Sequence, residues 1–199
     1  MKFISSSNDL SEYLDINIAK DIPIKNISID TRTIKKESLF IAIKGDKFDG
    51  NNFVEEAFKR GACLAIVDDK KLLKKSNKNI IYAKNTIAVL KKITENIIKK
   101  YNGIVIAITG SNGKTTTTNI IANSLINTSK TLGNYNNEIG MPLSIINASP
   151  KSKNIVLEIG AAKAGDINYL SKMLKPFVGV ITNIGNSHLE TLKNINGVF

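Results

Sequence analysis

The sequence has little cysteine, little arginine and no long hydrophobic run. Its single cysteine, Cys63, excludes an internal disulfide and is typical of a chain from a reducing compartment. No apolar run approaches the roughly 20 residues of a membrane-spanning helix, and residues 1–9 lack the basic start and apolar core of a secretory signal. We therefore expect a cytoplasmic chain without a membrane span, and its length of 199 residues leaves room for one domain or two small ones.

Arginine is scarce although the formal net charge is +11, because 26 of the basic residues are lysines and only Arg32 and Arg60 are arginines. Residues 1–103 hold 20 basic and 13 acidic side chains, and residues 104–199 hold 8 and 4. Nucleic-acid-binding proteins more often combine arginine clusters with interleaved aromatic side chains. The even spread of lysine indicates solubility and the steering of anions instead. A nucleic-acid-binding module is therefore only the third of our interpretations.

The first part of the chain alternates short apolar runs with helical patterns. Residues 26–30, 38–44, 64–67 and 79–83 predict strands, and residues 53–60 predict a helix that ends at Gly61. Residues 85–101 predict a longer helix whose apolar stripe is Leu90, Ile93, Ile97 and Tyr101. We expect residues 1–83 to form a small mixed α/β domain.

The second part begins with a continuous apolar run over residues 104–109, which is typical of a strand buried on both faces of a parallel sheet. A glycine loop and an apolar helix with Ile120, Ile121 and Leu125 follow. Further helices are predicted near 142–147 and 167–174, and further strands over 155–159 and 178–184. This alternation predicts right-handed βαβ units, so we expect residues 84–199 to form a doubly wound parallel-sheet domain.

The junction between the strand at 104–109 and the next helix reads Thr-Gly-Ser-Asn-Gly-Lys-Thr-Thr. Glycines let backbone N–H groups turn toward a phosphate, and the helix N-terminus adds partial positive charge. Ile108 stands where the general P-loop has its first glycine, so the loop is a GxxGKT variant. An ordinary glycine turn is the alternative, but the strand–helix junction favours a nucleotide loop. We predict that ATP and Mg²⁺ bind through Gly110, Ser111, Asn112, Gly113, Lys114, Thr115 and Thr116, with Lys114 reaching the β- and γ-phosphates and the Thr115 hydroxyl holding the metal.

Few acidic residues follow this loop, and Glu158 is unusual because it lies inside an apolar strand. A buried carboxylate needs a cation or strong hydrogen bonds, and ligands of open α/β sheets bind at the carboxyl ends of strands. Glu158 is therefore a candidate Mg²⁺ ligand or a residue that positions water, with a structural ion pair as the alternative. Asp166 follows Gly165 and fits a helix N-cap. The only histidine, His188, follows the next predicted strand, although a lone histidine is more often a packed or surface residue.

In their order and spacing, these blocks resemble the Mur ligase family of peptidoglycan synthesis. Residues 109–116 look like its ATP loop, and residues 157–167 and 181–190 resemble the next two blocks of the family. The segment Gly-Asn-Tyr-Asn-Asn-Glu-Ile-Gly-Met-Pro at 133–142 resembles the one that marks the MurF type. Residues 30–32 and 39–53 look like parts of the UDP-sugar-binding half.

The resemblance implies an ATP-dependent ligase that joins D-alanyl-D-alanine to a UDP-N-acetylmuramoyl-tripeptide through an acyl phosphate. It implies catalytic roles for Lys114, Glu158 and His188, with Glu158 and His188 joining Thr115 as Mg²⁺ ligands. It also implies contacts with the small-molecule substrates at Thr31, Arg32, Asn51, Asn134 and Asn137. A surface ion pair is the alternative for Arg32, and an ordinary asparagine-rich turn is the alternative for Asn134 and Asn137.

Two departures from the family concern particular residues, and a third concerns length. Asn51 stands where the family often has histidine, and Ala162-Lys163 where Asn-His is common. Such ligases are more than twice as long, with a C-terminal domain and a modified lysine beyond the block of His188. We therefore expect that residues 84–199 form an incomplete P-loop domain and that this chain by itself is inactive. We expect the full-length form to be a monomer. The alternatives are a MurE-type ligase, which adds a single amino acid, and a non-catalytic nucleotide-binding fragment.

Overall fold

The computed structural model describes residues 2–45, 48–75 and 79–185. The chain divides into two compact units, Lys2–Ile93 and a second unit that begins at Thr94. Helix α4 (Thr86–Lys100) contains this division, whereas the expected boundary after residue 83 falls in the loop before the helix. Leu90, Ile93 and Ile97 of its apolar stripe are fully buried, as the sequence predicts. Within the described ranges, no helix has the length and apolar character of a membrane span.

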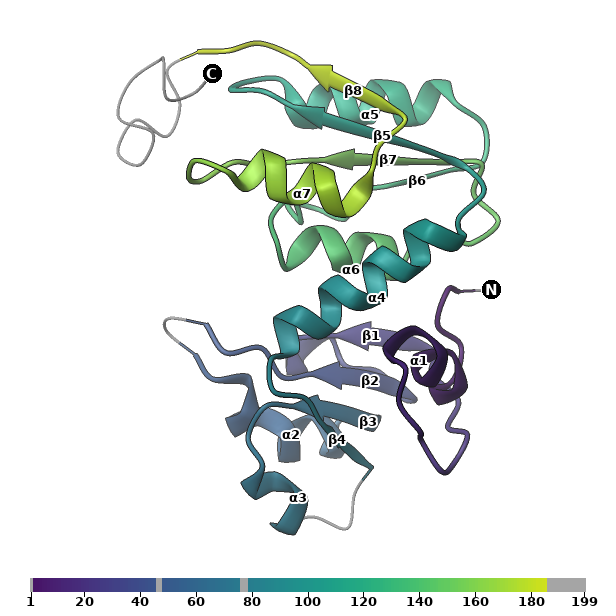
Figure 1. Ribbon diagram of the computed structural model, residues 1–199, viewed down its shortest axis with the longest axis vertical. Coiled ribbons are helices and arrows are strands. Elements are labelled where there is room, and N and C mark those ends of the chain that lie inside the picture. The colour runs from purple at the N-terminus through teal and green to yellow at the C-terminus, as the bar shows by residue number, and fades with distance from the viewer. Residues whose placement is uncertain (1, 46–47, 76–78, 186–199) are drawn as a thin grey trace. The chain divides into compact units, whose positions relative to one another are not determined.

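The first unit contains a parallel sheet of four strands in sequence order (Figure 1). These strands are β1 (Asn26–Ser28), β2 (Ser38–Ile41), β3 (Ala62–Val67) and β4 (Ile80–Tyr82). Helix α2 (Val54–Lys59) packs on β3, and Phe40, Val54 and Val67 belong to the core. The helix ends before Gly61, whose φ of 110° favours glycine, as the sequence predicts.

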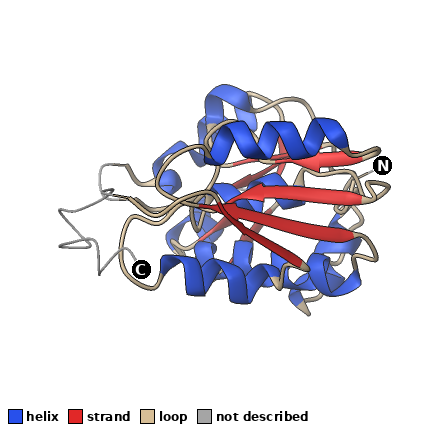
Figure 2. Ribbon diagram, turned by 90° about the horizontal axis from the view of Figure 1, so that it is seen from above, coloured by secondary structure: helices blue, strands red, loops and turns tan. Residues whose placement is uncertain are grey.

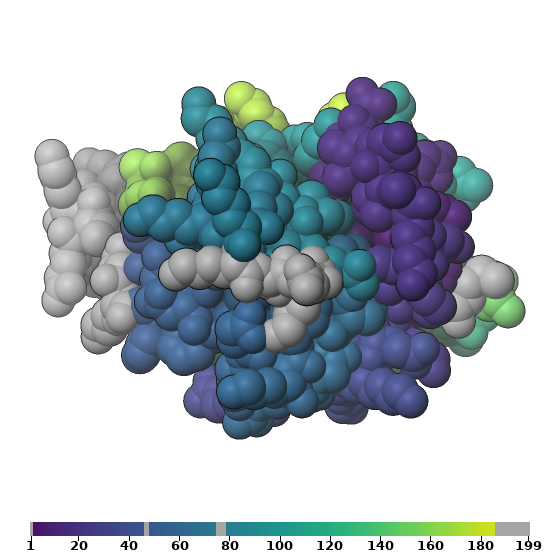
Figure 3. Space-filling view, turned by 90° about the horizontal axis from the view of Figure 1, so that it is seen from below, coloured from purple at the N-terminus to yellow at the C-terminus, as the bar shows by residue number. Residues whose placement is uncertain are grey.

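Four short elements of the first unit are additions to the sequence-based prediction. They are α1 (Ser7–Leu14), α3 (Lys71–Lys75) and two 3₁₀ helices, η1 (Thr31–Thr33) and η2 (Gly50–Phe53). The C-terminal end of α1 is tied to α4, since Lys92 Nζ donates to the Leu14 carbonyl at 2.5 Å. In Figure 3 the N-terminal residues of the first unit, which include α1, are purple, and residues 50–75 of the same unit are blue. A cavity of about 660 Å³ lies between these elements and is lined mainly by apolar side chains, among them Ile66 and Ile81.

The second unit contains another parallel sheet, in the order β6–β7–β5–β8. Its strands are β5 (Ile104–Thr109), β6 (Thr128–Lys130), β7 (Asn154–Glu158) and β8 (Val178–Ile181). Helices α5 (Lys114–Ser124), α6 (Gly140–Ile146) and α7 (Asp166–Leu174) connect them. Right-handed crossovers in opposite directions place α5 on the face opposite α6 and α7. Figure 1 shows α7 in front of the strands and α5 behind them, and Figure 2 shows helices on both sides.

Several details of the second unit differ from the prediction, among them the unpredicted strand β6. In the helix expected to be apolar, Thr118 and Ala122 are buried and Ile121 packs partly buried against the core, whereas Ile120 is 61% exposed. Strand β8 ends at Ile181 rather than at residue 184, because the residues after it bond to the glycine loop instead of continuing the ladder. Since all four strands are parallel, the carboxyl ends of β5, β7 and β8 share one edge of the sheet.

Candidate functional site

The glycine loop over residues 110–113 joins β5 to α5 at this edge. Gly110 has a φ of 138° and Gly113 a φ of 78°, and both conformations favour glycine. Gly113 is the N-cap of α5 and provides no side-chain cap. The amides in the first turn of a helix have no partner within the helix, so this N-terminus can receive an anion.

Lys114 is the first residue of α5, and its side chain folds back over the loop. Its Nζ donates to the carbonyl of Gly110 at 2.6 Å and lies 3.5 Å from the carbonyl of Ser111. The structure therefore places the ammonium group above the peptide groups that the sequence predicts to surround a phosphate. Thr115 and Thr116 follow in the same turn, and both are exposed.

Glu158 ends β7, beside β5, and is only 5% exposed. Its Oε2 accepts a hydrogen bond from the Thr115 hydroxyl at 2.7 Å, and its Oε1 accepts one from Asn136 Nδ2 at 2.8 Å. Its backbone N–H donates to the hydroxyl of Thr131 at 2.7 Å. Within the described part of the chain, no lysine or arginine forms an ion pair with Glu158. The ion pair considered as the alternative is thus absent there, and neutral donors hold the carboxylate.

The chemistry of these donors suits a hard cation. Mg²⁺ prefers oxygen ligands and is usually bound by one or two protein groups together with phosphate and water. The Thr115 hydroxyl and the Glu158 carboxylate are such ligands, and they already touch. No group of three or more His, Cys, Asp or Glu side chains occurs among the described residues that could form a separate metal cage. His188, the other expected ligand, lies outside the described residues.

A cavity of about 400 Å³ adjoins the loop and includes Lys114 in its lining. The other lining residues come from three segments, which are Asn136–Ile139, Gly160–Lys163 and the first turns of α7. Asn137 is one of them, and its Oδ1 accepts from the N–H groups of Ile139 and Gly140 before α6. Asn134, also expected in the cleft, is exposed and does not line this cavity. The contact between Asn136 and Glu158 was not predicted, because it depends on the path of an asparagine-rich loop.

Asp166 also lies at this cavity, but it is not the N-cap of α7. Gly165 occupies the N-cap position with a φ of 91°, so the N-cap assignment of Asp166 was wrong by one position. The Asp166 carboxylate instead accepts hydrogen bonds from the backbone N–H groups of Ala162 and Lys163, at 2.8 and 2.9 Å. Asp166 therefore fixes the loop that carries the departure from the family pattern.

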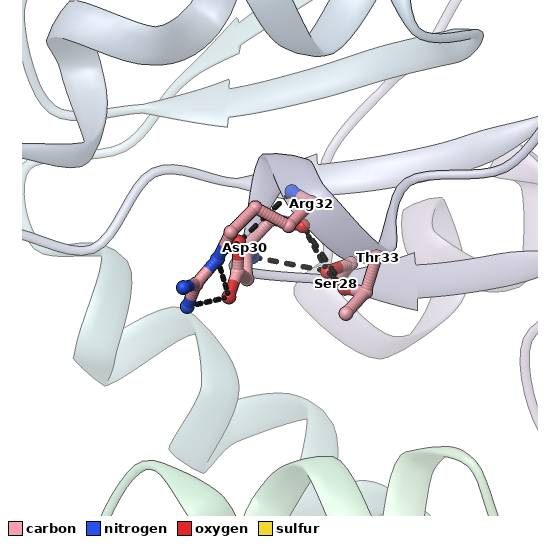
Figure 4. Close-up of polar contacts among 4 residues, drawn as sticks. All are labelled: Ser28, Asp30, Arg32 and Thr33. Atoms are coloured by element: carbon pink, nitrogen blue, oxygen red, sulfur yellow. Dashed lines mark hydrogen bonds and ion pairs between the residues drawn. The ribbon is translucent and has the colours of Figure 1, made fainter.

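In the first unit, Arg32 lies on η1 directly after Thr31, and it pairs with Asp30 (Figure 4). Arg32 Nε lies 3.0 Å from both oxygens of the Asp30 carboxylate, and Nη2 lies 2.6 Å from Oδ2. The hydrogen bonds from Arg32 hold the pKa of Asp30 below its usual value. The Arg32 side chain is 84% exposed, so the pair fixes the guanidinium while leaving part of it open to solvent. The ion pair considered for Arg32 is present.

Asn51, on η2, is 8% exposed and makes hydrogen bonds in several directions. Its Nδ2 donates to Asp49 Oδ1 at 2.7 Å and to Asp68 Oδ1 at 2.5 Å. Its Oδ1 accepts from the backbone N–H groups of Asp68 and Asp69, at 3.3 Å each. The structure thus assigns Asn51 a connecting role between η2 and the end of β3, and a contact with substrate remains a prediction.

Comparison with known proteins agrees with these features. Residues 23–101 match the Mur ligase family catalytic domain, and residues 108–199 match the Mur ligase middle domain. The UDP-N-acetylmuramoyl-tripeptide–D-alanyl-D-alanine ligase of Bacillus subtilis is 36% identical over 88% of this chain and 39% of its own length. That of Buchnera aphidicola is 38% identical over all of this chain and 44% of its own length. The chain therefore spans less than half the length of these relatives.

Solved structures show the same likeness. MurF from Acinetobacter baumannii matches with a TM-score of 0.82 at 31% identity, over 95% of this chain and 43% of that protein. MurF ligase from Thermotoga maritima, solved in complex with ADP, matches with a TM-score of 0.77 at 34% identity, over 90% of this chain and 42% of that protein. These matches confirm the predicted α/β fold class with its parallel nucleotide-loop sheet. The chain belongs to the Mur ligase family.

Proposed function

We propose that this chain provides the UDP-muramoyl-substrate-binding and ATP-binding parts of a MurF-type ligase. Such an enzyme joins D-alanyl-D-alanine to UDP-N-acetylmuramoyl-tripeptide and consumes ATP. The observation that carries the proposal is the contact between Thr115 and the buried Glu158 beside an uncapped helix N-terminus. The names of the matching relatives and the ADP bound in the Thermotoga maritima structure support it.

In this proposal, the phosphates of ATP bind at the N-terminus of α5. The first-turn amides and the helix dipole receive the negative charge, and Lys114 exchanges its bond with the Gly110 carbonyl for one with a phosphate oxygen. Thr115, Glu158 and His188 would hold Mg²⁺, and the hydrogen bond between Thr115 and Glu158 supports this part of the proposal. When bound there, Mg²⁺ neutralises phosphate charge and so favours phosphoryl transfer.

The cavity beside Lys114 is suited to the acceptor of that phosphoryl group. A carboxylate oxygen of the muramoyl-tripeptide attacks the γ-phosphorus, ADP leaves, and an acyl phosphate is formed. The amine nitrogen of D-alanyl-D-alanine then attacks the acyl carbon, phosphate leaves, and the nitrogen loses a proton. Lys114 lines the cavity and would neutralise charge at the first of these steps, while the surrounding loops orient the acceptor.

The first unit would bind the UDP end of that substrate. Asp30 holds the Arg32 guanidinium through Nε and Nη2, which leaves Nη1 to bind an anionic or carbonyl group of the nucleotide. Thr31 lies beside it on η1. For Asn51 to bind the same substrate, a ligand has to replace one of the hydrogen bonds of its side chain within the protein.

Titration calorimetry with Mg·ADP and Mg·ATP tests the nucleotide site. Lys114→Ala should remove most of the affinity without unfolding the protein, because the amine contacts only loop carbonyls in the absence of ligand. Lys172→Ala is the matched control, since it removes an exposed lysine of α7 outside the cavity lining. Equal nucleotide affinity of the original chain and a folded Lys114→Ala protein would refute the assignment.

A second titration tests the type of ligase. A MurF-type protein should bind UDP-N-acetylmuramoyl-tripeptide more tightly than the corresponding dipeptide, because the tripeptide is its acceptor. A MurE-type protein should show the opposite order, since it acts one amino acid earlier. Preference for the dipeptide would therefore overturn the MurF-type proposal while leaving the nucleotide site intact.

A further inference from the structure

The segment over residues 182–185, directly after β8, forms hydrogen bonds with the glycine loop. The hydroxyl of Thr182 contacts the carbonyl of Asn112 at 2.6 Å and that of Thr109 at 3.2 Å. The side-chain oxygen of Asn183 accepts from the N–H of Asn112 at 2.8 Å, and its backbone carbonyl accepts from the N–H of Ser111 at 3.1 Å. The Ser111 hydroxyl donates to the carbonyl of Gly185 at 3.0 Å and accepts from its N–H at 2.9 Å.

These bonds determine which groups of the loop remain for a phosphate. Asn183 already occupies the N–H groups of Ser111 and Asn112. The amides of the first turn of α5 are therefore the donors left for an anion. Thr182 also holds the Asn112 carbonyl, which would repel a phosphate if it turned toward the same site.

The close approach of Thr182 also accounts for the glycine at position 110. A Cβ on Gly110 would lie 2.1 Å from Thr182 Oγ1 and 2.9 Å from the carbonyl oxygen of Asn183. A Cβ on Gly113 would meet nothing closer than 4.0 Å. The two glycines of the loop therefore have different roles. Gly110 allows the close approach of the segment after β8, and Gly113 is the N-cap at which α5 begins.

We propose that Thr182 and Asn183 are positioning residues of the nucleotide site. They hold the peptide groups of Asn112 in the orientation that leaves the N-terminus of α5 open to phosphate, and nucleotide affinity therefore depends on them. The inference rests on the proposed nucleotide binding, and it adds two residues from a different part of the chain. A purely structural role would lower stability but would leave the affinity of the folded protein unchanged.

Three variants separate these possibilities. Thr182→Val keeps the shape of the side chain but removes the hydroxyl, and Thr182→Ser restores it. Asn183→Ala removes the acceptor for the Asn112 N–H at an exposed position, where the fold should survive. Thr128→Val is the matched control, because the Thr128 hydroxyl likewise contacts two backbone carbonyls, of Leu125 and Ile126, at the start of β6 in the same sheet.

Calorimetric titration with Mg·ADP and urea unfolding are measured for each protein. We expect Thr182→Val and Asn183→Ala each to lower nucleotide affinity by roughly tenfold, as the loss of one or two well-formed hydrogen bonds predicts. Thr182→Ser should bind almost as tightly as the original chain, and Thr128→Val should bind equally tightly whatever its unfolding midpoint. Unchanged affinity of folded Thr182→Val and Asn183→Ala would overturn the inference. Failure of the original chain to bind Mg·ADP would instead overturn the proposed nucleotide function on which it rests.

Discussion

Glu158 is the only charged side chain among the buried residues that the structure describes. Its two carboxylate oxygens accept hydrogen bonds from neutral groups, the Thr115 hydroxyl and the Asn136 amide. Such bonds orient and stabilise a carboxylate but do not neutralise its charge, and a buried charge without a counterion is costly. A bound cation would remove this imbalance, so burial and hydrogen bonding together favour a metal-binding role for Glu158 over a purely structural one.

Replacing Glu158 with glutamine tests this role. Glu158→Gln should weaken Mg·ADP binding by about 10- to 100-fold, in the range typical of altered metal sites, because it removes the charge that a cation needs. The fold should persist, since the Thr115 hydroxyl can accept a hydrogen bond from the new amide. Calorimetry with Mg²⁺ and with excess EDTA separates the effects. An equal loss of affinity with and without the metal would contradict the prediction.

The contact between Thr115 and Glu158 could be predicted from the sequence. The contacts that surround it could not. Two apolar runs predict neighbouring parallel strands, and parallel strands have their carboxyl ends at one edge of the sheet. One run precedes Gly-Lys-Thr and the other has a glutamate near its end, so these residues are expected at the same edge. Asn136, Thr182 and Asn183 act through the paths of irregular loops, for which the sequence contains no periodic signal. Asn51 was assigned from resemblance alone, whereas the four hydrogen bonds of its side chain depend on the fold.

At the scale of elements, prediction succeeded where burial imposes a pattern. Strand β5 has the predicted bounds because it is an interior strand of its sheet, and its residues 104–108 are therefore all apolar. Strand β6 was missed because it is an edge strand with the polar sequence Thr-Ser-Lys. Helix α1 was missed although its capping box, Ser6 with Asp9, is a readable start signal.

Asn51 joins two elements, and its removal should be costly. Asn51→Ala leaves the backbone N–H groups of Asp68 and Asp69 and the carboxylate of Asp68 without these partners. We expect a loss of about 1–3 kcal/mol in the free energy of unfolding, measured by urea denaturation. Asn52→Ala, at the exposed neighbouring position, should change it by less than about 0.5 kcal/mol. Equal effects of the two substitutions would show that the bonds of Asn51 contribute little.

Tyr101, directly after α4, links this segment to the loop before β7. Its hydroxyl donates to the carbonyl of Ser152 at 2.9 Å, and burial raises the pKa of Tyr101 to about 12. In the unfolded chain a tyrosine ionises near pH 10, so between about pH 10 and 12 the folded state binds the extra proton. This contribution to stability is therefore present below pH 10 and is lost as the pH rises toward 12.

Urea unfolding across this pH range provides the test. The stability advantage of the original chain over Tyr101→Phe should shrink steadily from pH 9.5 to 11.5, because only the original chain carries the ionising hydroxyl. The comparison cancels the titration of the many lysines, which both proteins share. A constant difference between the two proteins over this range would contradict the shift in the pKa of Tyr101.

At the scale of the molecule, two units with separate parallel sheets carry separate candidate sites. Arg32 and Asn51 belong to the first unit, and the glycine loop and Glu158 belong to the second. Both proposed ligands are anionic nucleotides, and the net charge of +11 favours their approach at low ionic strength. Both sheets are parallel, so in each unit the carboxyl ends of the strands share one edge. Polar groups lie at that edge in both units.

Two separate sites predict two separate patterns of protection in amide hydrogen exchange. Mg·ADP should slow exchange in β5, α5 and β8, because a ligand at about 100 times its Kd stabilises the structure that binds it by about 2.7 kcal/mol. UDP-N-acetylmuramoyl-tripeptide should slow exchange chiefly in β1, η1 and η2 of the first unit. Lys114→Ala should abolish the response to Mg·ADP and retain the response to the UDP-linked ligand, which makes each titration the control for the other. If Mg·ADP protected the first unit as strongly as the second, or if Lys114→Ala removed both responses, the assignment of one nucleotide ligand to each unit would be wrong.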